Sequence, residues 1–252
     1  MHRHVASVAG ALAVLVSVSA YAQPAPPDTV TEVIRQKARP DMQQQYEAAR
    51  KKHMGWHKAQ NDPWAWDVFE VVTGPDTGGY VIASGNHQWK EMDEWDAKLG
   101  DADTADAAAS VGGLSTGSQR AYWTQLNAIS RLPAPDERSP YLTVAYYRLK
   151  PGSDAAIRAA ITKLNAALDA GKFPLRSIWY VLSSGGMGPT YAVVTPRAAL
   201  ADMAPTPTLL DTVEKQLGKD GSEALIKAFF ENVVSVNTEM LHRRPDLSYV
   251  PK

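Results

Sequence analysis

Two histidines, His53 and His57, stand four residues apart in a segment whose apolar residues repeat with the period of a helix. This spacing puts both imidazoles on one helix face, where they could bind a single metal ion or line a pocket. Tyr46 and Trp56 belong to the same face. Because a buried polar group without a partner costs about 1–3 kcal/mol, this face favours a ligand or a hydrated cavity. The plainer alternative is a histidine satisfied by hydrogen bonds within the fold.

No third metal ligand is obvious beside His53 and His57, and the chain has no cysteine. The lack of cysteine also excludes thiolate nucleophiles and disulfide bonds. We therefore predict no metal site and leave the cofactor unknown. A metal or a haem at the two histidines is considered, but neither is favoured.

A second polar and aromatic group, Asn86, His87 and Trp89, follows a predicted strand, and Trp66 opens a predicted hairpin. A strand-to-helix junction can line the space between a sheet and its helices, so His87 could approach the face of His53. The alternative is that Asn86 caps the helix and that Trp89 and Trp95 belong to the core. The predicted ligand-binding residues are Tyr46, His53, Trp56, His57, Trp66, Asn86, His87 and Trp89.

Three common catalytic signatures are missing from the sequence. No phosphate-binding loop, dinucleotide fingerprint or HExxH motif is present. Arg35 and Lys37 could point inward and hold a carboxylate, but we expect them at a sheet edge or a solvated strand end. Catalytic residues are therefore unknown, and whether the protein is an enzyme stays open.

Residues about 111 positions apart match along the chain, which indicates a duplicated unit. The matched pairs include Val33 with Val144, Pro40 with Pro151, Gly74 with Gly185, Tyr80 with Tyr191 and Met92 with Met203. The copies differ on the helix face, where His53 and His57 match Leu164 and Leu168. The polar side chains are thus special to the first copy, and for that reason we place a ligand there.

Each copy has the order strand, helix, hairpin, helices and strand, which is typical of a ferredoxin-like βαββαβ unit. We predict an α+β fold in which tandem duplicated units cover each other sheet to sheet, as a pseudo-symmetric α/β barrel of the dimeric type within one chain. The alternative is two units side by side, each covered by a partner chain. The predicted boundaries are a signal peptide 1–22, a disordered leader 23–28, a first unit 29–131, a linker 132–140 and a second unit 141–252.

For several segments the secondary structure is predicted from weaker local patterns. Residues 101–117 are rich in Ala, Asp and Gly, and we predict a loop or a loosely held helix there. We expect a helix over residues 118–129 that runs into a short strand. In the second copy we expect helices over residues 209–217 and 222–236.

The N-terminus has the features of an export signal. A short basic start precedes an apolar run, and residues 20–22, Ala-Tyr-Ala, fit the small-x-small cleavage rule. We predict an exported protein, periplasmic or secreted, cleaved near Ala22 and not inserted in the membrane; an N-terminal anchor is the alternative. Removing the signal leaves 25 basic and 27 acidic residues, which gives no electrostatic footprint for nucleic acid.

Residues 146–152, Tyr-Tyr-Arg-Leu-Lys-Pro-Gly, resemble the opening strand and turn of NIPSNAP-type and related dimeric α/β-barrel proteins. That superfamily also includes antibiotic-biosynthesis monooxygenases, haem-degrading monooxygenases and stress-response barrels. The resemblance implies the barrel fold and admits an oxygenase activity. The first copy keeps only Lys-Ala-Arg-Pro at residues 37–40. The His, Asn and Trp of the haem-degrading members cannot be carried over, because the surrounding motif differs.

We predict an exported α/β-barrel protein that binds a small apolar or aromatic molecule in the first unit, between helix and sheet. Seven Trp and ten Tyr provide aromatic surface for such a pocket. One alternative is a haem-dependent or cofactor-poor oxygenase that uses the same pocket. Another is a structural protein whose barrel serves assembly. A homodimer is compatible with the sequence.

Replacing His53 with leucine, the residue of the second copy, tests this interpretation. If the asymmetry serves a ligand, His53→Leu weakens ligand binding without lowering stability. Native mass spectrometry of protein from an exporting host detects the bound molecule, and thermal unfolding reports the stability. A large loss of stability with unchanged binding would instead identify a core histidine.

Overall fold

The computed structural model describes residues 26–134 and 137–251; the predicted signal peptide lies outside them. The strands are β1 (Thr29–Ala38), β2 (Asp67–Thr73), β3 (Gly79–His87), β4 (Ser115–Gln125), β5 (Tyr141–Leu149), β6 (Ile178–Ser184), β7 (Thr190–Arg197) and β8 (Val233–Arg243). The α-helices are α1 (Gln43–Ala59), α2 (Trp89–Trp95), α3 (Asp101–Ser110), α4 (Asp154–Ala170) and α5 (Leu209–Phe230). No helix in the described ranges is long and apolar enough to cross a membrane.

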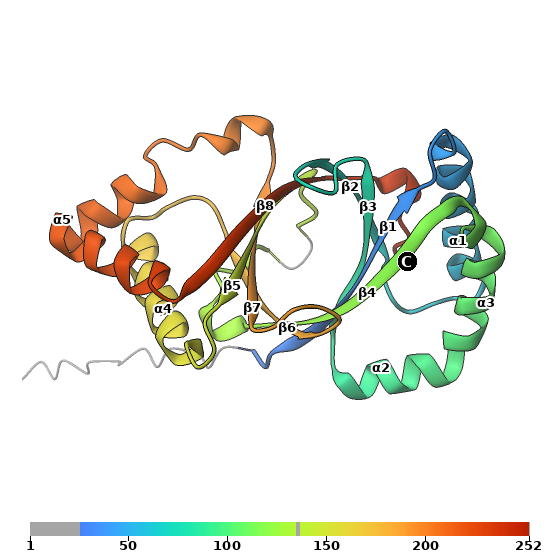
Figure 1. Ribbon diagram of the computed structural model, residues 1–252, viewed down its shortest axis with the longest axis horizontal. Coiled ribbons are helices and arrows are strands. Elements are labelled where there is room, and N and C mark those ends of the chain that lie inside the picture. Colours follow the sequence, from blue (N-terminus) through green and yellow to red (C-terminus); the bar gives the residue numbers. More distant parts are fainter. Residues whose placement is uncertain (1–25, 135–136, 252) are drawn as a thin grey trace, which may run out of the picture.

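The eight strands close into an antiparallel barrel in the order β1-β3-β2-β8-β5-β7-β6-β4 (Figure 1). The first half contributes β4-β1-β3-β2 and the second half contributes β8-β5-β7-β6, with the same order of elements along the chain. Two seams join the halves, one between β2 and β8 and the other between β4 and β6. The predicted α+β barrel is thus confirmed.

The strands alternate between a face toward the helices and a face toward the barrel interior, as the two-residue period of a strand requires. On β1, Ile34 packs against the core beneath α1, whereas Val33 and Arg35 face the interior. Figure 1 shows α1 and α3 outside the sheet of the first half, and α4 and α5 outside the sheet of the second. The helices therefore cover the outer surface and leave the interior to strand residues.

The predicted helix over residues 118–129 is wrong, because most of this segment forms β4. Trp123 and Gln125 face the barrel interior and alternate with Tyr122 and Thr124. This period of two matches a strand that pairs with β1 on one side and β6 on the other. The polar composition of the segment hid that period.

The structure also decides the secondary structure of two other segments that had weak local patterns. Residues 101–110 form the regular helix α3, which confirms the helix alternative and not the loop. Alanine favours a helix, and aspartates in the first turn complement the helix dipole. The helix expected over residues 222–236 ends at Phe230, and the β-branched Val233, Val234 and Val236 belong to β8.

The segment after β8 is fastened to α1 by an ion pair. Arg244 donates to both carboxylate oxygens of Glu47, at 2.9 Å each, and the Tyr80 hydroxyl donates to the same carboxylate. The hydrogen bonds from Arg244, helped by the one from Tyr80, outweigh burial and lower the pKa of the Glu47 carboxyl to about 2. The ionised carboxylate thus stabilises this contact between the chain's last segment and its first helix.

Glu47→Gln should lower the free energy of unfolding by about 1 kcal/mol at pH 7, since the pair is partly screened by solvent. The folded pKa near 2 lies below the ordinary value of 4.5. Wild type therefore has the full contribution above about pH 4.5 and loses it as the pH falls through about 2. Urea unfolding at pH 7 and pH 3 measures the difference, which should shrink at the lower pH.

Glu94→Gln is the matched control, because Glu94 forms an exposed pair with Lys90 on α2. It should leave stability unchanged at both pH values. An equal loss in the two variants would show that the contact with Arg244 is not stabilising.

Candidate functional site

The sheet of the first half borders two cavities, one on each face. Inside the barrel, inward side chains of the strands line a cavity of about 1090 Å³, here called the lumen. On the outer face, a cavity of about 390 Å³ lies among α1, α3, β1 and β4, here called the helix–sheet cavity. The two spaces differ in chemistry.

The wall of the lumen is mainly apolar. Its inward residues pack into one cluster of aliphatic and aromatic side chains that includes Val33, Phe69, Val81, Trp123, Val144 and Tyr180. An eight-stranded barrel is wide enough either to be filled by its own side chains or to hold one small ligand. The volume of about 1090 Å³ is at the upper end of ordinary ligand pockets.

A polar group interrupts this apolar wall. Arg35 donates to Glu239 at 3.1 Å, to Asp76 at 3.3 Å and to the Tyr146 hydroxyl, which donates in turn to Glu239 at 2.6 Å. Burial raises the pKa of Tyr146 well above its usual range, and Glu239 adds to this while Arg35 opposes it. The expectation that Arg35 lies at a sheet edge is wrong: it points inward and holds a carboxylate, as the other interpretation required.

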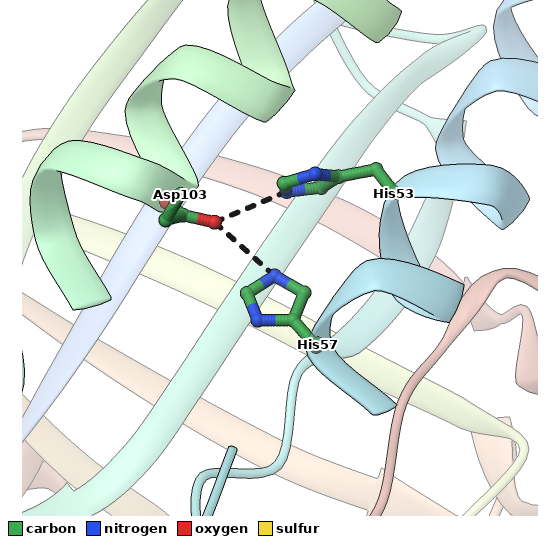
Figure 2. Close-up of side chains that lie close together, drawn as sticks. All are labelled: His53, His57 and Asp103. Atoms are coloured by element: carbon green, nitrogen blue, oxygen red, sulfur yellow. Dashed lines mark ion pairs between the residues drawn. The ribbon is translucent and has the colours of Figure 1, made fainter. Parts of the chain in front are cut away.

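The two histidines of α1 meet an aspartate of α3 in the helix layer (Figure 2). Asp103 Oδ1 lies 3.3 Å from the Nε2 atoms of both His53 and His57. Nδ1 of His53 lies 2.7 Å from Asp106 Oδ2, and Nδ1 of His57 lies 2.8 Å from Asp62 Oδ2. Each ring therefore has one carboxylate at Nδ1 and the shared carboxylate of Asp103 at Nε2. His53, His57 and Asp103 are all buried.

Asp62 holds His57 in this cluster through a hydrogen bond to its ring. Besides His57, its carboxylate accepts hydrogen bonds at 2.9 Å from the backbone N–H of Trp64 and from the indole N–H groups of Trp66 and Trp95. Burial opposes the ionised form, but these hydrogen bonds together outweigh it and lower the pKa of Asp62. The ring of His57 is thus held in one orientation by a carboxylate that is itself fixed.

The helix–sheet cavity adjoins the cluster and is lined by both polar and apolar side chains, with a larger polar share than the lumen. Its lining includes Gln36, Arg50, His53, His57, Asp103 and Arg120. Arg50 is buried, and its Nε atom makes no hydrogen bond with any described residue. A cavity of this kind suits water, an ion or a small polar group better than an apolar molecule.

Four of the eight predicted ligand-binding residues lie together on or beside α1. The ring of Trp56 stacks 6.0 Å from that of His53, and the ring of Trp66 lies 5.3 Å from that of His57. Tyr46 lies nearer the start of α1, where its hydroxyl donates to Gln36 at 2.8 Å. His53, His57 and Trp66 line the helix–sheet cavity, whereas Tyr46 and Trp56 do not.

Of the other predicted residues, Asn86 and His87 end β3 and Trp89 begins α2. His87 is buried, its Nε2 lies 2.7 Å from Ser84 Oγ, and its ring stacks on Trp64 at 3.7 Å. Asn86 is exposed in the left-handed region, with φ of 66°, and borders the lumen. Trp89 is 50% exposed. The alternative is wrong for Asn86 and Trp89, since Gln88 caps α2 and Trp89 is exposed, but Trp95 packs against the core as expected.

Sequence reasoning missed the carboxylates Asp62, Asp103 and Asp106. Asp103 and Asp106 stand three residues apart, a spacing that places them on one face of a helix. That signal was available, but the segment has little to bury and was read as a loop or a loose helix. Asp62 lies just after the end of α1, five residues beyond His57.

Burial lowers the pKa of the His87 imidazole and so favours its neutral form. This histidine therefore satisfies the plainer interpretation of a core residue bonded to a neighbouring hydroxyl. His53 and His57 are also hydrogen-bonded within the fold, through Nδ1 to Asp106 and Asp62, but their Nε2 atoms face Asp103 without such a bond.

No protein-family model matches the chain, and no curated protein matches its sequence. Solved structures match it in fold. A "Putative monooxygenase" of Fusobacterium nucleatum subsp. nucleatum ATCC 25586 gives a TM-score of 0.57 at 9% identity, over 85% of this chain and 92% of that one. A "putative monooxygenase" of Lactobacillus acidophilus NCFM gives 0.54 at 9%, over 89% and 97%.

A mutant chlorite dismutase of Candidatus Nitrospira defluvii gives a TM-score of 0.55 at 10% identity, over 86% of this chain and 92% of that one. At such identities the likeness shows the fold alone, an α+β chain with an eight-stranded antiparallel barrel. This agrees with the resemblance to monooxygenase-type barrels, and nothing singles out the NIPSNAP type.

Asp62→Asn should destabilise the protein by about 2–3 kcal/mol, because an amide cannot accept all four hydrogen bonds and leaves buried donors unpaired. Urea unfolding followed by tryptophan fluorescence measures the loss. Asp93→Asn, on the exposed face of α2, is the control and should have no effect. A loss below about 0.5 kcal/mol at Asp62, as at ordinary surface sites, would show that it does not hold the cluster together.

Proposed function

We propose that this chain is a binding protein for a small, mainly apolar or aromatic molecule held in the lumen of its barrel. The observation that carries the proposal is the lumen itself, about 1090 Å³ behind an apolar wall. Ligand sites are usually concave and mainly apolar, with a few fixed polar groups that orient the ligand. The lumen has both features.

The polar group formed by Arg35, Tyr146 and Glu239 would orient such a ligand. These side chains are held by hydrogen bonds to one another and lie on three different strands. A ligand with a hydroxyl, carbonyl or carboxylate group could share their hydrogen bonds while its apolar part contacts the wall. The ligand class is therefore an apolar or aromatic molecule with one hydrogen-bonding group.

The sequence placed this ligand between helix and sheet in the first unit. The helix–sheet cavity is smaller, at about 390 Å³, and its lining of arginine, glutamine, aspartate and histidine favours polar contents. Among the predicted residues only Asn86 borders the lumen. We therefore assign the apolar ligand to the lumen and treat the histidine side separately.

The oxygenase alternative is supported by fold likeness to proteins named as monooxygenases, which is an analogy and not a site. A haem does not fit the buried histidines, because the Nε2 atoms of His53 and His57 face Asp103 and that of His87 is bonded to Ser84.

Export and internal duplication complete the proposal. The repeated order of elements and the matching strand orders of the two halves support a duplication. The signal-like residues 1–22 support export of a chain that begins near Gln23. The mass of the protein purified from an exporting host tests this start.

Filling the lumen tests the binding function. Ala83 on β3 and Ala121 on β4 line the lumen, and tryptophan at either place would occupy part of it. We expect Ala83→Trp and Ala121→Trp each to weaken binding of the fluorescent probe N-phenyl-1-naphthylamine by about tenfold or more, equal to about 1.4 kcal/mol. Fluorescence titration of the wild-type protein and both variants measures the affinity.

Val236→Trp is the matched control, since Val236 lies on β8, is 43% exposed and does not line the lumen. It should bind the probe as wild type does. Absence of binding by wild type, or equal binding by all four proteins, would refute a ligand site in the lumen.

A further inference from the structure

Two imidazoles and one carboxylate direct acceptor atoms at a common point between α1 and α3 (Figure 2). The Nδ1 atoms of His53 and His57 lie 2.7 and 2.8 Å from the carboxylates of Asp106 and Asp62. An ionised carboxylate only accepts hydrogen bonds, so each Nδ1 carries a proton. In the neutral imidazole the Nε2 atom then presents a lone pair, and both Nε2 atoms face Asp103.

One oxygen of Asp103 has no hydrogen-bond donor in this arrangement. Its Oδ1 atom is buried and makes no hydrogen bond with any residue in the described ranges. Its neighbours are the two Nε2 atoms at 3.3 Å, neither of which is aligned as a donor. Three buried acceptors that face one another repel, and a cation among them turns the repulsion into attraction.

We propose that His53, His57 and Asp103 bind a divalent transition-metal ion, for which Zn²⁺ has the best-fitting geometry. In a tetrahedral zinc site with bonds of about 2.0–2.1 Å, neighbouring ligand atoms are about 3.3 Å apart. Both Nε2–Oδ1 distances have this value. One ligand atom from each of the three residues lies within 4.8 Å of the others. Neutral imidazole and carboxylate are ligands that such ions accept.

The surrounding residues form the outer support that metal sites usually have. A metal-bound histidine commonly donates its other N–H to a carboxylate, which fixes the ring and raises its basicity. Asp106 does this for His53 and Asp62 does it for His57. Asp62 is itself held by three further N–H donors, from Trp64, Trp66 and Trp95. The ligands are thus oriented before the ion binds.

The fourth coordination position opens on the helix–sheet cavity, which all three ligands line. Three protein ligands with one open position are typical of catalytic zinc sites, whereas structural sites are closed by four. Arg50 also lines this cavity, and its Nε atom has no partner among the described residues. Water or a small anion could therefore complete the coordination.

This proposal corrects our expectation that the chain has no metal site. That expectation rested on the lack of a third ligand near the histidines in sequence, and Asp103 is 46 residues beyond His57. The proposal is also independent of the lumen, because the cluster lies on the opposite face of the sheet. Failure of one leaves the other intact.

The experiment uses the full chain, purified without a histidine tag, treated with a chelator and dialysed. Isothermal titration with Zn²⁺ should show one ion per chain, and Co²⁺ should give the visible absorption of a tetrahedral site. Zn²⁺ should also raise the thermal midpoint by mass action. Asp103→Asn and His53→Gln should each weaken Zn²⁺ binding by about 100-fold, at least the loss that even outer-sphere changes cause.

His87→Gln is the matched control, a buried histidine of the same half that does not contact the cluster. It should bind Zn²⁺ as wild type does. Metal-free Asp103→Asn separates a metal ligand from a structural ion pair. We expect it to be at least as stable as metal-free wild type, because its amide can donate to an Nε2 atom.

Two results would overturn the proposal. One is wild type that binds less than one Zn²⁺ per chain, or variants that bind it as wild type does. The other is a metal-free Asp103→Asn protein that is much less stable than wild type while Zn²⁺ leaves the wild-type midpoint unchanged. That pattern would mean that two protonated imidazoles pair with Asp103.

Discussion

Closure of the barrel at its two seams is the constraint on which both cavities depend. At one seam Phe69 and Val71 of β2 pair with β8, and at the other Trp123 and Gln125 of β4 pair with β6. The four strands of each half would otherwise have unpaired edges and an uncovered apolar face. Closure satisfies the edges and turns those faces inward around the lumen. It also leaves the outer faces to the helices, where the histidine cluster forms.

The two halves solve the same packing problem with different side chains. Tyr46 on α1 and Ile157 on α4 are 111 positions apart, and both are completely buried. Toward the second half of each helix, α1 continues with His53 and His57, whereas α4 continues with aliphatic residues. Helix α3 supplies the carboxylates that make buried histidines tolerable, and α5 supplies apolar contacts to α4 instead. The buried histidines of α1 therefore depend on a neighbouring helix, α3, that carries carboxylates.

Local periodicity was enough to predict most of the fold. Each copy was expected to open with a strand, a helix and a hairpin, and β1, α1, β2 and β3 have this order, as do β5, α4, β6 and β7. β4 was missed because both faces of this strand carry polar residues: Gln125 faces the lumen and Thr124 faces outward. In the site, His53 and His57 could be found from their spacing. Asp103 could not, because its contact depends on how α3 lies across α1, and no local pattern records that packing.

β1 separates the lumen from the helix layer. Arg35 faces the lumen, whereas Glu32 and Ile34 face the helices. A slip of one residue would exchange the two sets and separate the guanidinium from Glu239 and Asp76. Pairing with β3 and β4 on its two sides holds β1 against such a slip. Insertions and deletions within this strand are therefore far less tolerable than substitutions, because a single one would reverse both surfaces together.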